Sequence, residues 1–571
     1  MERQRPDTTS NEIELYIRTY YSVLRSTGAV RVRAFEESHL YSNSSLHLGA
    51  RDTQPDVSAF GYAASRLPQC MVDVRRLVLG QSEEQFESYG YDVHNWHRVR
   101  SPGRRRPLRF DARETLAAFI RSSSDIDDLV PIVTAYQIEW NKIHALLASS
   151  ARGGELSQTA TELDADTLQE LVREILDLDA GAAAKLREAL GERFGDAVAS
   201  MSALRLDLRM QLLAASFSQY QRAAQRWWSN IEPIYLRDDK PRRRPVYFVS
   251  SNTHSLANLI GGYARNHREA LLETARREAS AELVAQLEDG LAKNPENAAN
   301  LLYFVLRQHI QAEQGAIDEV QAWDAESGIC NVPDQGHVEV SAQVIELAKI
   351  RPDRCDPRIH VDGIETLAAS DAVILNIDYP LGMAAYQLLS RVGQGSGPLL
   401  GVYVMGKAAT LNGRVGDVMI SNVVHDEHSY NTYLFKNAFR ADDVWPYLQY
   451  GTVLDNQKAL TARSAFLQNR QYMGVFYREG FTVLEMEAGP YMSAIFELAD
   501  PRRHPNDEIV RLGERITFDA GILHYASDTP YSRRQELLSK SLSYFGMDST
   551  YACAVAITRR IFQLELERLQ S

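Results

Sequence analysis

The stretch Leu484-Glu485-Met486-Glu487-Ala488-Gly489-Pro490 decides how the second half of this chain is interpreted. It closes a strand pattern and runs into a helix expected over residues 490–498. A buried strand has no structural need for two acids, and burying an unpaired carboxylate is costly. Since residues i and i+2 of a strand share a face, Glu485 and Glu487 could face one cleft with Met486 turned away. A local turn presenting all three, or an edge strand with its acids in solvent, stays open.

A glycine-rich segment precedes this stretch. Leu400–Val404 is typical of a strand, and small residues from Gly406 to Ala409, with Lys407 among them, follow it. The turn Gly416-Asp417 then leads into another strand, 417–420. Small residues at a strand end let a ligand approach the backbone closely, although strand ends often carry glycine for other reasons.

A third segment follows near the C-terminal end, His524-Tyr525-Ala526-Ser527-Asp528-Thr529-Pro530. A strand over 521–526 delivers Ser527 and Asp528 at its end, where α/β sheets place ligand-binding groups. A carboxylic acid held there could act as a general acid. Alternatively, Asp528 caps a helix that begins after Pro530.

These segments belong to an α/β pattern that begins after Pro245. Val246–Val249 predicts a buried strand, a polar turn follows, and a helix begins near Leu256 with Ser, Thr and Asn available as caps. Free backbone N–H groups at that helix start could instead hold an anion. Helical patterns cover 264–325, and further strands are expected at 372–375, 451–454 and 482–487 before a closing helix over 547–569. We expect a mixed sheet flanked by helices.

The first 240 residues have a mostly helical pattern. Apolar residues recur at helical spacing over 12–26 and 131–149, and 166–231 is rich in strong helix formers. Residues 37–60 are polar and predict a loop. We therefore expect a helical domain of unknown role over 1–240 and an α/β domain over 241–571, with a helical insertion around 264–325.

Two arginine clusters lie in or next to the first domain. One spans 98–109 and the other is Arg242-Arg243-Arg244. Such clusters can contact phosphate groups. For 98–109 we favour a solvated loop that pairs with acidic groups, because charge runs usually lie on solvated surfaces.

Composition excludes several function classes. The 62 Lys and Arg side chains face 75 Asp and Glu in 571 residues, a net charge of −13, so the chain lacks the positive field of a general nucleic-acid or membrane-surface binder. No apolar h-region follows the N-terminus, and no run of 18 apolar residues occurs, so we expect neither a secretory signal nor a membrane span. Four scattered cysteines predict reduced thiols in a cytoplasmic protein.

The order of the three segments resembles the nucleoside phosphorylase and nucleosidase superfamily, which includes purine nucleoside phosphorylase and methylthioadenosine/adenosylhomocysteine nucleosidase. The resemblance rests on strand-GxAxxL with Gly416-Asp417, then Glu485-Met486-Glu487-Ala488, then Ser527-Asp528, and covers roughly 370–565. It implies a nucleoside-phosphorylase-like mixed sheet, a small-molecule purine nucleoside or nucleotide as substrate, no cofactor or metal, and a homo-oligomer.

The resemblance also implies roles. Glu487 would bind the ribose 2′- and 3′-hydroxyls, Met486 would pack against the sugar, and Asp528 would donate a proton to N7 of the purine. Glu485, Gly406, Lys407 and Ser527 are further candidates for the substrate site. Protonating the leaving group lowers the barrier to breaking the N-glycosidic bond, and general acid catalysis contributes about 10²–10⁴-fold.

Departures from the family's pattern favour water over phosphate as the nucleophile. Met405 stands where phosphorylases carry an Arg, and the first loop, Ser251 to His254, has none. Asn376 to Gly382 replaces a glycine-rich loop and carries an acid. Lys407 could hold inorganic phosphate, a substrate 5′-phosphate or nothing, so phosphorolysis stays open.

Two alternative functions stay open. The altered loop at 376–382 also fits a nucleotide-binding sensor with little catalysis, and a nucleotide-depleting toxic effector is a third possibility. His425-Asp426-Glu427-His428 could suggest a metal cluster, but a satisfied or exposed histidine pair is the favoured interpretation.

Overall fold

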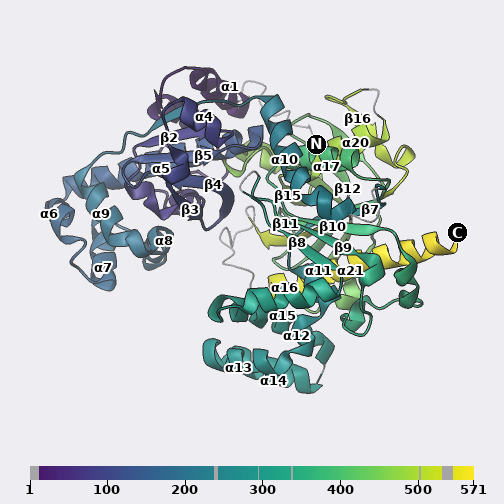
Figure 1. Cartoon of the computed structure of the whole chain (residues 1–571). Coiled ribbons are helices and arrows are strands. Elements are labelled where there is room, and N and C mark those ends of the chain that lie inside the picture. Colours follow the sequence, from purple (N-terminus) through teal and green to yellow (C-terminus); the bar gives the residue numbers. More distant parts are fainter. Residues whose placement is uncertain (1–11, 237–241, 294, 336–337, 501–502, 530–543) are drawn as a thin grey trace. The chain divides into compact units, whose positions relative to one another are not determined.

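The structure is a computed structural model that describes residues 12–236, 242–293, 295–335, 338–500, 503–529 and 544–571 (Figure 1). The chain forms two compact units. Unit 1 contains the chain up to Ala223, a short segment around residue 338 and Ala462–Glu479. Unit 2 contains the remainder. Among the described residues, no helix is both long and apolar enough to cross a membrane.

Unit 1 combines helices with a six-stranded mixed sheet. Its helices are α1 (Glu12–Leu24), α2 (Arg33–Tyr41), α3 (Val57–Ser65), α4 (Glu83–Ser88), α5 (Ser123–Ser149), α6 (Ala151–Thr159), α7 (Ala165–Ile175), α8 (Ala180–Leu190), α9 (Phe194–Ala203) and, in the later segment, α19 (Arg470–Arg478). Its strands, in sheet order, are β1 (Val30–Arg31), β6 (Arg209–Leu212), β2 (Arg76–Gly80), β5 (Thr115–Phe119), β4 (Arg104–Phe110) and β3 (His97–Ser101).

The sheet of unit 1 was not predicted from the sequence. Its strands are short, and several lie between helical patterns that dominate the periodicity. The loop expected over 37–60 is partly wrong, because α2 extends to Tyr41 and α3 begins at Val57.

The arginine cluster at 98–109 forms the β3–β4 hairpin and is not a loop. Arg106 is buried, and its guanidinium pairs with Asp125 at 2.9 Å and with Asp128 at 3.0 Å. Arg104 binds the same Asp128 through two hydrogen bonds of 2.9 and 2.6 Å. The expected pairing with acidic groups is therefore correct, but part of it is buried.

Unit 2 contains an eleven-stranded sheet. Its strands are β7 (Val246–Ser251), β8 (Ile329–Val332), β9 (Ala342–Glu346), β10 (Val373–Asp378), β11 (Leu399–Thr410), β12 (Val418–Asp426), β13 (Thr432–Leu434), β14 (Val453–Thr461), β15 (Val483–Glu485), β16 (Ile509–Arg511) and β17 (Asp519–Asp528). Its helices are α11 (Ser255–Gly261), α12 (Tyr263–Asn266), α13 (Arg268–Glu278), α14 (Ala281–Lys293), α15 (Pro295–Ala312), α16 (Ala316–Glu326), α17 (Ala384–Gly395), α18 (Ala441–Val444), α20 (Ala488–Ala499) and α21 (Tyr544–Gln570). Helix α10 (Phe217–Leu236) crosses the boundary between the units.

Five strands of unit 2 form a closed ring of pairings. β12 pairs with β14, β14 with β15, β15 with β11, β11 with β17, and β17 returns to β12. Closure leaves no free edge in this part of the sheet. The remaining strands extend the sheet as β7, β10, β9 and β8 on one side and β13 and β16 on the other.

Helices cover both faces of this sheet, with α17 and α20 on one side and α11 and α21 on the other (Figure 1). Successive residues of a strand point to opposite faces of the sheet, so one strand packs against helices on both sides. Tyr247, Val249 and Ile374 join Tyr551 and Ile557 of α21 in one buried core. From the intervening position Phe248, a ring contacts Tyr491 of α20.

The α/β interpretation of the second half is confirmed at the level of elements. Every strand that the sequence predicted after Pro245 is present, as are the helices over 263–326 and the closing helix. β8, β9, β13 and β16 were not predicted, because they are only three to five residues long. The extent of the two domains expected from the sequence stays a prediction.

Candidate active site

Strand register brings the two predicted acids to the two strands that flank β11. Ala409 of β11 pairs with Asp528 of β17 on one side and with Leu484 of β15 on the other. Paired strands lie about 4.8 Å apart, so the backbones of Leu484 and Asp528 are about 10 Å apart across β11. Glu487 follows Leu484 by three residues. Leu484 and Asp528, 44 positions apart in the chain, thus lie in one region of the strand ring.

Glu485 holds the turn that carries Glu487. It is the last residue of β15 and is buried. Its Oε2 accepts the backbone N–H groups of Glu487 at 2.7 Å and Ala488 at 2.6 Å, and Thr461 donates its hydroxyl to Oε1. Burial raises the pKa of Glu485 to about 7, against the opposing effect of these hydrogen bonds. The chain therefore turns directly after Glu485, and both acids are buried, which rules out an edge strand with its acids in solvent. That all three residues face one cleft stays a prediction.

Glu487 lies where the chain leaves the strand for helix α20. It occupies the N-cap position and is 6 % exposed. Its Oε1 accepts the backbone N–H of Gly382 at 3.1 Å, which connects it to the loop after β10. Tyr491, one turn later, donates its hydroxyl to Ser250 of β7 at 2.7 Å. The carboxylate of Glu487 is thus held among the ends of β7, β10 and β15.

Tyr379 lies between Gly406 and this acid. A Cβ on Gly406 would stand 2.4 Å from Cζ of Tyr379, so the absence of a side chain at Gly406 makes room for the ring. The Tyr379 hydroxyl is buried without a hydrogen-bond partner in the part of the chain that the structure describes. Burial, and after it the charges of Glu487 and Glu485, raise the pKa of Tyr379 well above its ordinary value. An unpartnered buried hydroxyl is rare in proteins and marks a position to explain.

His524 is a second unpartnered group. It is fully buried, pairs in register with Gly406, and neither ring nitrogen has a hydrogen-bond partner among the described residues. Its Nε2 lies 3.9 Å from Oε2 of Glu485. Burial lowers the pKa of His524 to about 3, so the imidazole is neutral. Sequence reasoning assigned no role to Tyr379, in the segment after the strand expected at 372–375, or to His524, inside the strand expected over 521–526.

The other predicted site residues have different environments. Asp528 is half-buried and accepts the Ser527 hydroxyl at 2.8 Å. Met486 is half-buried, while Lys407 is exposed, because it alternates with buried Gly406 along β11. Their predicted contacts with a substrate stay predictions.

Two polar segments from the sequence have ordinary partners. Just before helix α11, whose N-cap is His254, the Oδ1 of Asn252 accepts the backbone N–H groups of His254 and Ser255 at 3.0 and 2.7 Å. His428 Nδ1 lies 2.9 Å from Asp426 Oδ1, and His425 Nδ1 lies 2.9 Å from Thr432 Oγ1. Among the described residues, no group of three or more His, Cys, Asp or Glu has the arrangement of a metal site.

Solved structures show a partial likeness. A protein described as a methylthioadenosine nucleosidase from Weissella paramesenteroides aligns with 44 % of this chain and 96 % of its own, at 11 % identity and a TM-score of 0.28. The 5′-methylthioadenosine/S-adenosylhomocysteine nucleosidase from Neisseria meningitidis, in complex with methylthio-immucillin-A, covers 43 % and 94 %, at 11 % identity and a TM-score of 0.28. The nucleosidase from Colwellia psychrerythraea, in complex with adenine, covers 44 % and 90 %, at 11 % identity and a TM-score of 0.25. TM-scores of this size carry no argument about shared structure or activity.

Sequence comparison with curated proteins found no match. A family model described as "Family of unknown function (DUF6909)" matches residues 32–563, which is most of both units. The chain therefore belongs to the family of unknown function DUF6909.

Proposed function

We propose that unit 2 cleaves the N-glycosidic bond of a purine nucleoside or nucleotide by hydrolysis. The single observation that carries the proposal is the register across β11, in which Ala409 pairs with both Asp528 and Leu484, three residues before Glu487. One acid for a sugar and one for its departing base must lie about a nucleoside's length apart, and a separation of two strands, about 10 Å, has that scale. The order of the sequence motifs supports the same assignment.

The proposed chemistry gives each acid one task. Protonated Asp528 donates its proton to N7 of the purine while the bond between N9 and C1′ breaks, and a water molecule adds to C1′ and releases a proton. The sugar passes through an oxocarbenium-like state. Glu487 accepts hydrogen bonds from the ribose hydroxyls and places negative charge near the developing cation. Glu485 positions Glu487 through the turn that it caps.

Hydrolysis is favoured over phosphorolysis by the loops near these acids. The loop after β7, residues 252–254, and the loop after β10, residues 379–383, contain no Arg or Lys. Met405 is buried in β11, and Lys407 on the same strand is exposed. Phosphate binding normally requires cationic side chains or several converging N–H groups.

The test is release of free base from a panel of purine nucleosides and nucleotides, with and without inorganic phosphate, with products identified by mass. We expect release without phosphate, a kcat about 10²–10⁴-fold lower for Asp528→Asn, and a raised KM with a reduced kcat for Glu487→Gln. Glu514→Gln is the matched control, because Glu514 is an exposed acid of the same unit. Base release that depends on phosphate would replace hydrolysis by phosphorolysis.

A second candidate function is nucleotide binding without turnover. The observation that favours it is the hydrogen bond from the Gly382 N–H to Glu487, which occupies part of the carboxylate assigned to the ribose. Equilibrium binding measured with the same panel separates the two functions. Micromolar binding with no product after prolonged incubation, unchanged by Asp528→Asn, would identify a sensor.

A further inference from the structure

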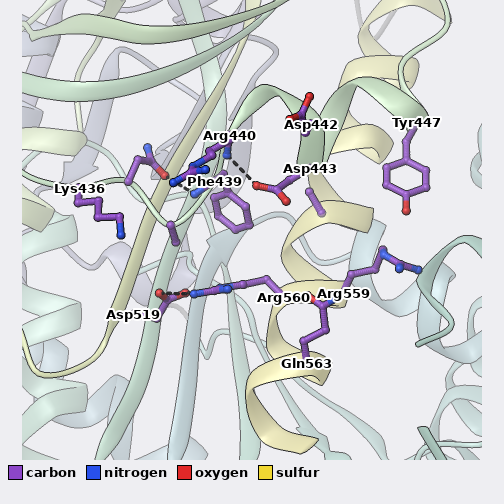
Figure 2. A pocket seen from close by; sticks show the side chains of 13 residues that line it. Lys436, Phe439, Arg440, Asp442, Asp443, Tyr447, Asp519, Arg559, Arg560 and Gln563 are labelled. Carbon is purple, nitrogen blue, oxygen red and sulfur yellow. Dashed lines mark hydrogen bonds and ion pairs between the residues drawn. The ribbon is translucent and has the colours of Figure 1, made fainter. Parts of the chain in front are cut away.

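A solvent-open cavity lies at the other end of β17 from the candidate active site. Its volume is about 520 Å³, and all the residues that line it belong to unit 2 (Figure 2). The walls come from Asp519 at the start of β17, from the segment between Lys436 and Tyr447, and from α21. Asp519 and Asp528 are nine residues apart on one strand, or about 30 Å. This basic cavity is therefore separate from the region around Asp528 and Glu487.

Four cationic side chains line the basic cavity. Arg559 and Arg560 come from α21, and Lys436 and Arg440 come from the facing segment. Ala556, Arg559, Arg560 and Gln563 are spaced three and four residues apart, so they lie on the side of α21 that lines the cavity. In Figure 2, Arg560 extends toward Asp519 and Arg559 toward the side of Tyr447. Three acids, Asp442, Asp443 and Asp519, line the same cavity, so the four cations leave its lining with a small positive excess in a chain whose net charge is −13.

The two helix arginines are held in place. Arg560 donates Nε and Nη2 to the two carboxylate oxygens of Asp519, both at 3.0 Å, and Tyr403 donates its hydroxyl to the same carboxylate at 2.9 Å. Arg559 donates Nη1 to the carbonyl oxygen of Arg358 at 3.1 Å and also to that of His360. Each guanidinium has five N–H donors, so several donors of each remain for a ligand.

Lys436 and Arg440 line the cavity from the segment between Lys436 and Tyr447. Both are exposed, and neither forms an ion pair with any described residue. Two acids of the same segment, Asp442 and Asp443, also line the cavity. An oxygen of Asp443 accepts the backbone N–H of Arg440 at 2.7 Å, and Asp442 is exposed.

Two aromatic side chains, Phe439 and Tyr447, also line the cavity. Phe439 is buried against β17, where a Cβ on Gly521 would stand 2.3 Å from its Cε2. Its ring also contacts Tyr403. Tyr447 adds a half-buried aromatic ring on the side of Arg559 (Figure 2).

We propose that the basic cavity binds the phosphate group of a small phosphorylated molecule. A phosphate presents several anionic oxygens at once, which matches cations arriving from two separate elements, whereas a single carboxylate is satisfied by one guanidinium, as Asp519 is. A cavity of about 520 Å³ has room for a phosphate and an attached organic group. The site is independent of the nucleosidase proposal, because it shares no residue with it.

The test uses phenyl phosphate, which carries an aromatic group and a phosphate but has no glycosidic bond to cleave. Calorimetric titration of the full chain compares it with phenol and with inorganic phosphate. We expect phenyl phosphate to bind, phenol not to bind, and affinity to fall as salt is added. Inorganic phosphate binding equally well would identify the free anion as the natural ligand and still support the site.

Paired variants decide whether the binding is at this cavity. Lys436→Gln with Arg440→Gln should weaken phenyl phosphate binding by at least about tenfold, since two charged contacts are removed. Lys185→Gln with Arg511→Gln is the matched control, because it removes one exposed Lys and one exposed Arg elsewhere and changes the net charge equally. Glu487→Gln should bind phenyl phosphate as the wild type does. Three results would each overturn the proposal. They are an unchanged affinity of the Lys436→Gln, Arg440→Gln variant for phenyl phosphate, binding of phenol as tight as that of phenyl phosphate, and no binding of phenyl phosphate at millimolar concentration.

Discussion

The ring of Tyr379 rests against the α-carbon of Gly406, so closely that a Cβ there would stand 2.4 Å from Cζ and 2.6 Å from the hydroxyl oxygen of Tyr379. This contact joins the loop after β10 to β11, in the strand ring. Gly406 has an ordinary negative φ, so what the position requires is space and not an unusual backbone.

Gly406→Ala should therefore disturb both stability and the site. The methyl group must displace Tyr379 or β11, and overpacking of this kind costs about 1–3 kcal/mol in the free energy of unfolding. The displaced loop carries Gly382, whose N–H reaches Glu487, so base release should also fall. Urea unfolding and the nucleosidase assay measure the two effects.

The control for this substitution is Gly154→Ala. Gly154 lies in helix α6 with no atom within 4 Å of an added Cβ, so this variant should be as stable as the wild type or slightly more stable. Adding Tyr379→Leu to Gly406→Ala should restore part of the lost stability by removing the ring. If the double variant is no more stable than Gly406→Ala, the contact with Tyr379 is not the cause.

Glu485 predicts a pH dependence of stability. Its folded pKa of about 7 lies above the ordinary value of 4.5, so the native state binds its proton more tightly than the unfolded state does. The contribution of this proton to the free energy of unfolding, about 3 kcal/mol, is fully present below about pH 4.5 and is lost as pH rises through 7.

Glu485→Gln mimics the protonated form and should lack this loss. Urea titration from pH 5 to pH 8 measures the free energy of unfolding of both proteins. As pH rises over this range, the variant should become more stable relative to the wild type. A constant difference across that range would contradict the raised pKa.

Much of unit 2 could be predicted from sequence because its central strands are long apolar runs. Val246–Val249 and Leu400–Val404 are buried on both faces, and such runs are recognisable without knowledge of their neighbours. The position of Asp528 at a strand end followed from the same pattern. What the pattern could not give was which strand lies between Asp528 and Glu487, because register depends on contacts between distant segments.

The different functions of Glu485 and Glu487 could not be read from the sequence either. Both acids follow an apolar strand, but one carboxylate turns back to the backbone of its own turn, and the other accepts the N–H of Gly382. In unit 1 the partners of charged side chains are even harder to infer from the sequence. β4 holds four arginines and a proline, which is an unusual composition for a strand, and its pairing with the buried acids of α5 makes it possible.

That pairing predicts a strong effect of Arg106→Leu. The substitution leaves buried Asp125 without this partner and removes one of the two partners of Asp128, and breaking a buried pair from one side costs about 3–5 kcal/mol. Although burial raises the pKa of Asp128, Arg104 and Arg106 lower it to below its ordinary value. Its stabilisation is therefore present above about pH 4 and is lost as pH falls below the ordinary pKa of 3.8.

Urea unfolding at two pH values tests this account. The difference in the free energy of unfolding between wild type and Arg106→Leu should be large at pH 7 and should narrow toward pH 3, as the carboxylate of Asp128 takes up a proton. Arg105→Leu is the control, because Arg105 is the exposed neighbour on the other face of β4, and its loss should change the unfolding free energy by less than about 1 kcal/mol. A gap that is the same at both pH values would show that lost packing, and not uncompensated charge, causes the effect.

The unpartnered hydroxyl of Tyr379 predicts opposite effects on stability and activity. Within the described residues this buried group has no hydrogen-bond partner, and an unsatisfied hydroxyl costs about 1–3 kcal/mol. Tyr379→Phe should therefore raise the free energy of unfolding, since the ring that packs on Gly406 is kept and only the hydroxyl is lost. If the hydroxyl is retained because it donates to a bound substrate near Glu487, the same variant should raise KM for base release.

Two outcomes would contradict this account. If Tyr379→Phe is more stable but has the KM and kcat of the wild type, the hydroxyl does not bind substrate. If Tyr379→Phe is less stable, the hydroxyl has a hydrogen-bond partner in solution. Tyr433→Phe is the matched control, because the Tyr433 hydroxyl pairs with Ser493 at 2.7 Å and with Asn431 at 3.0 Å, so its removal should lower stability.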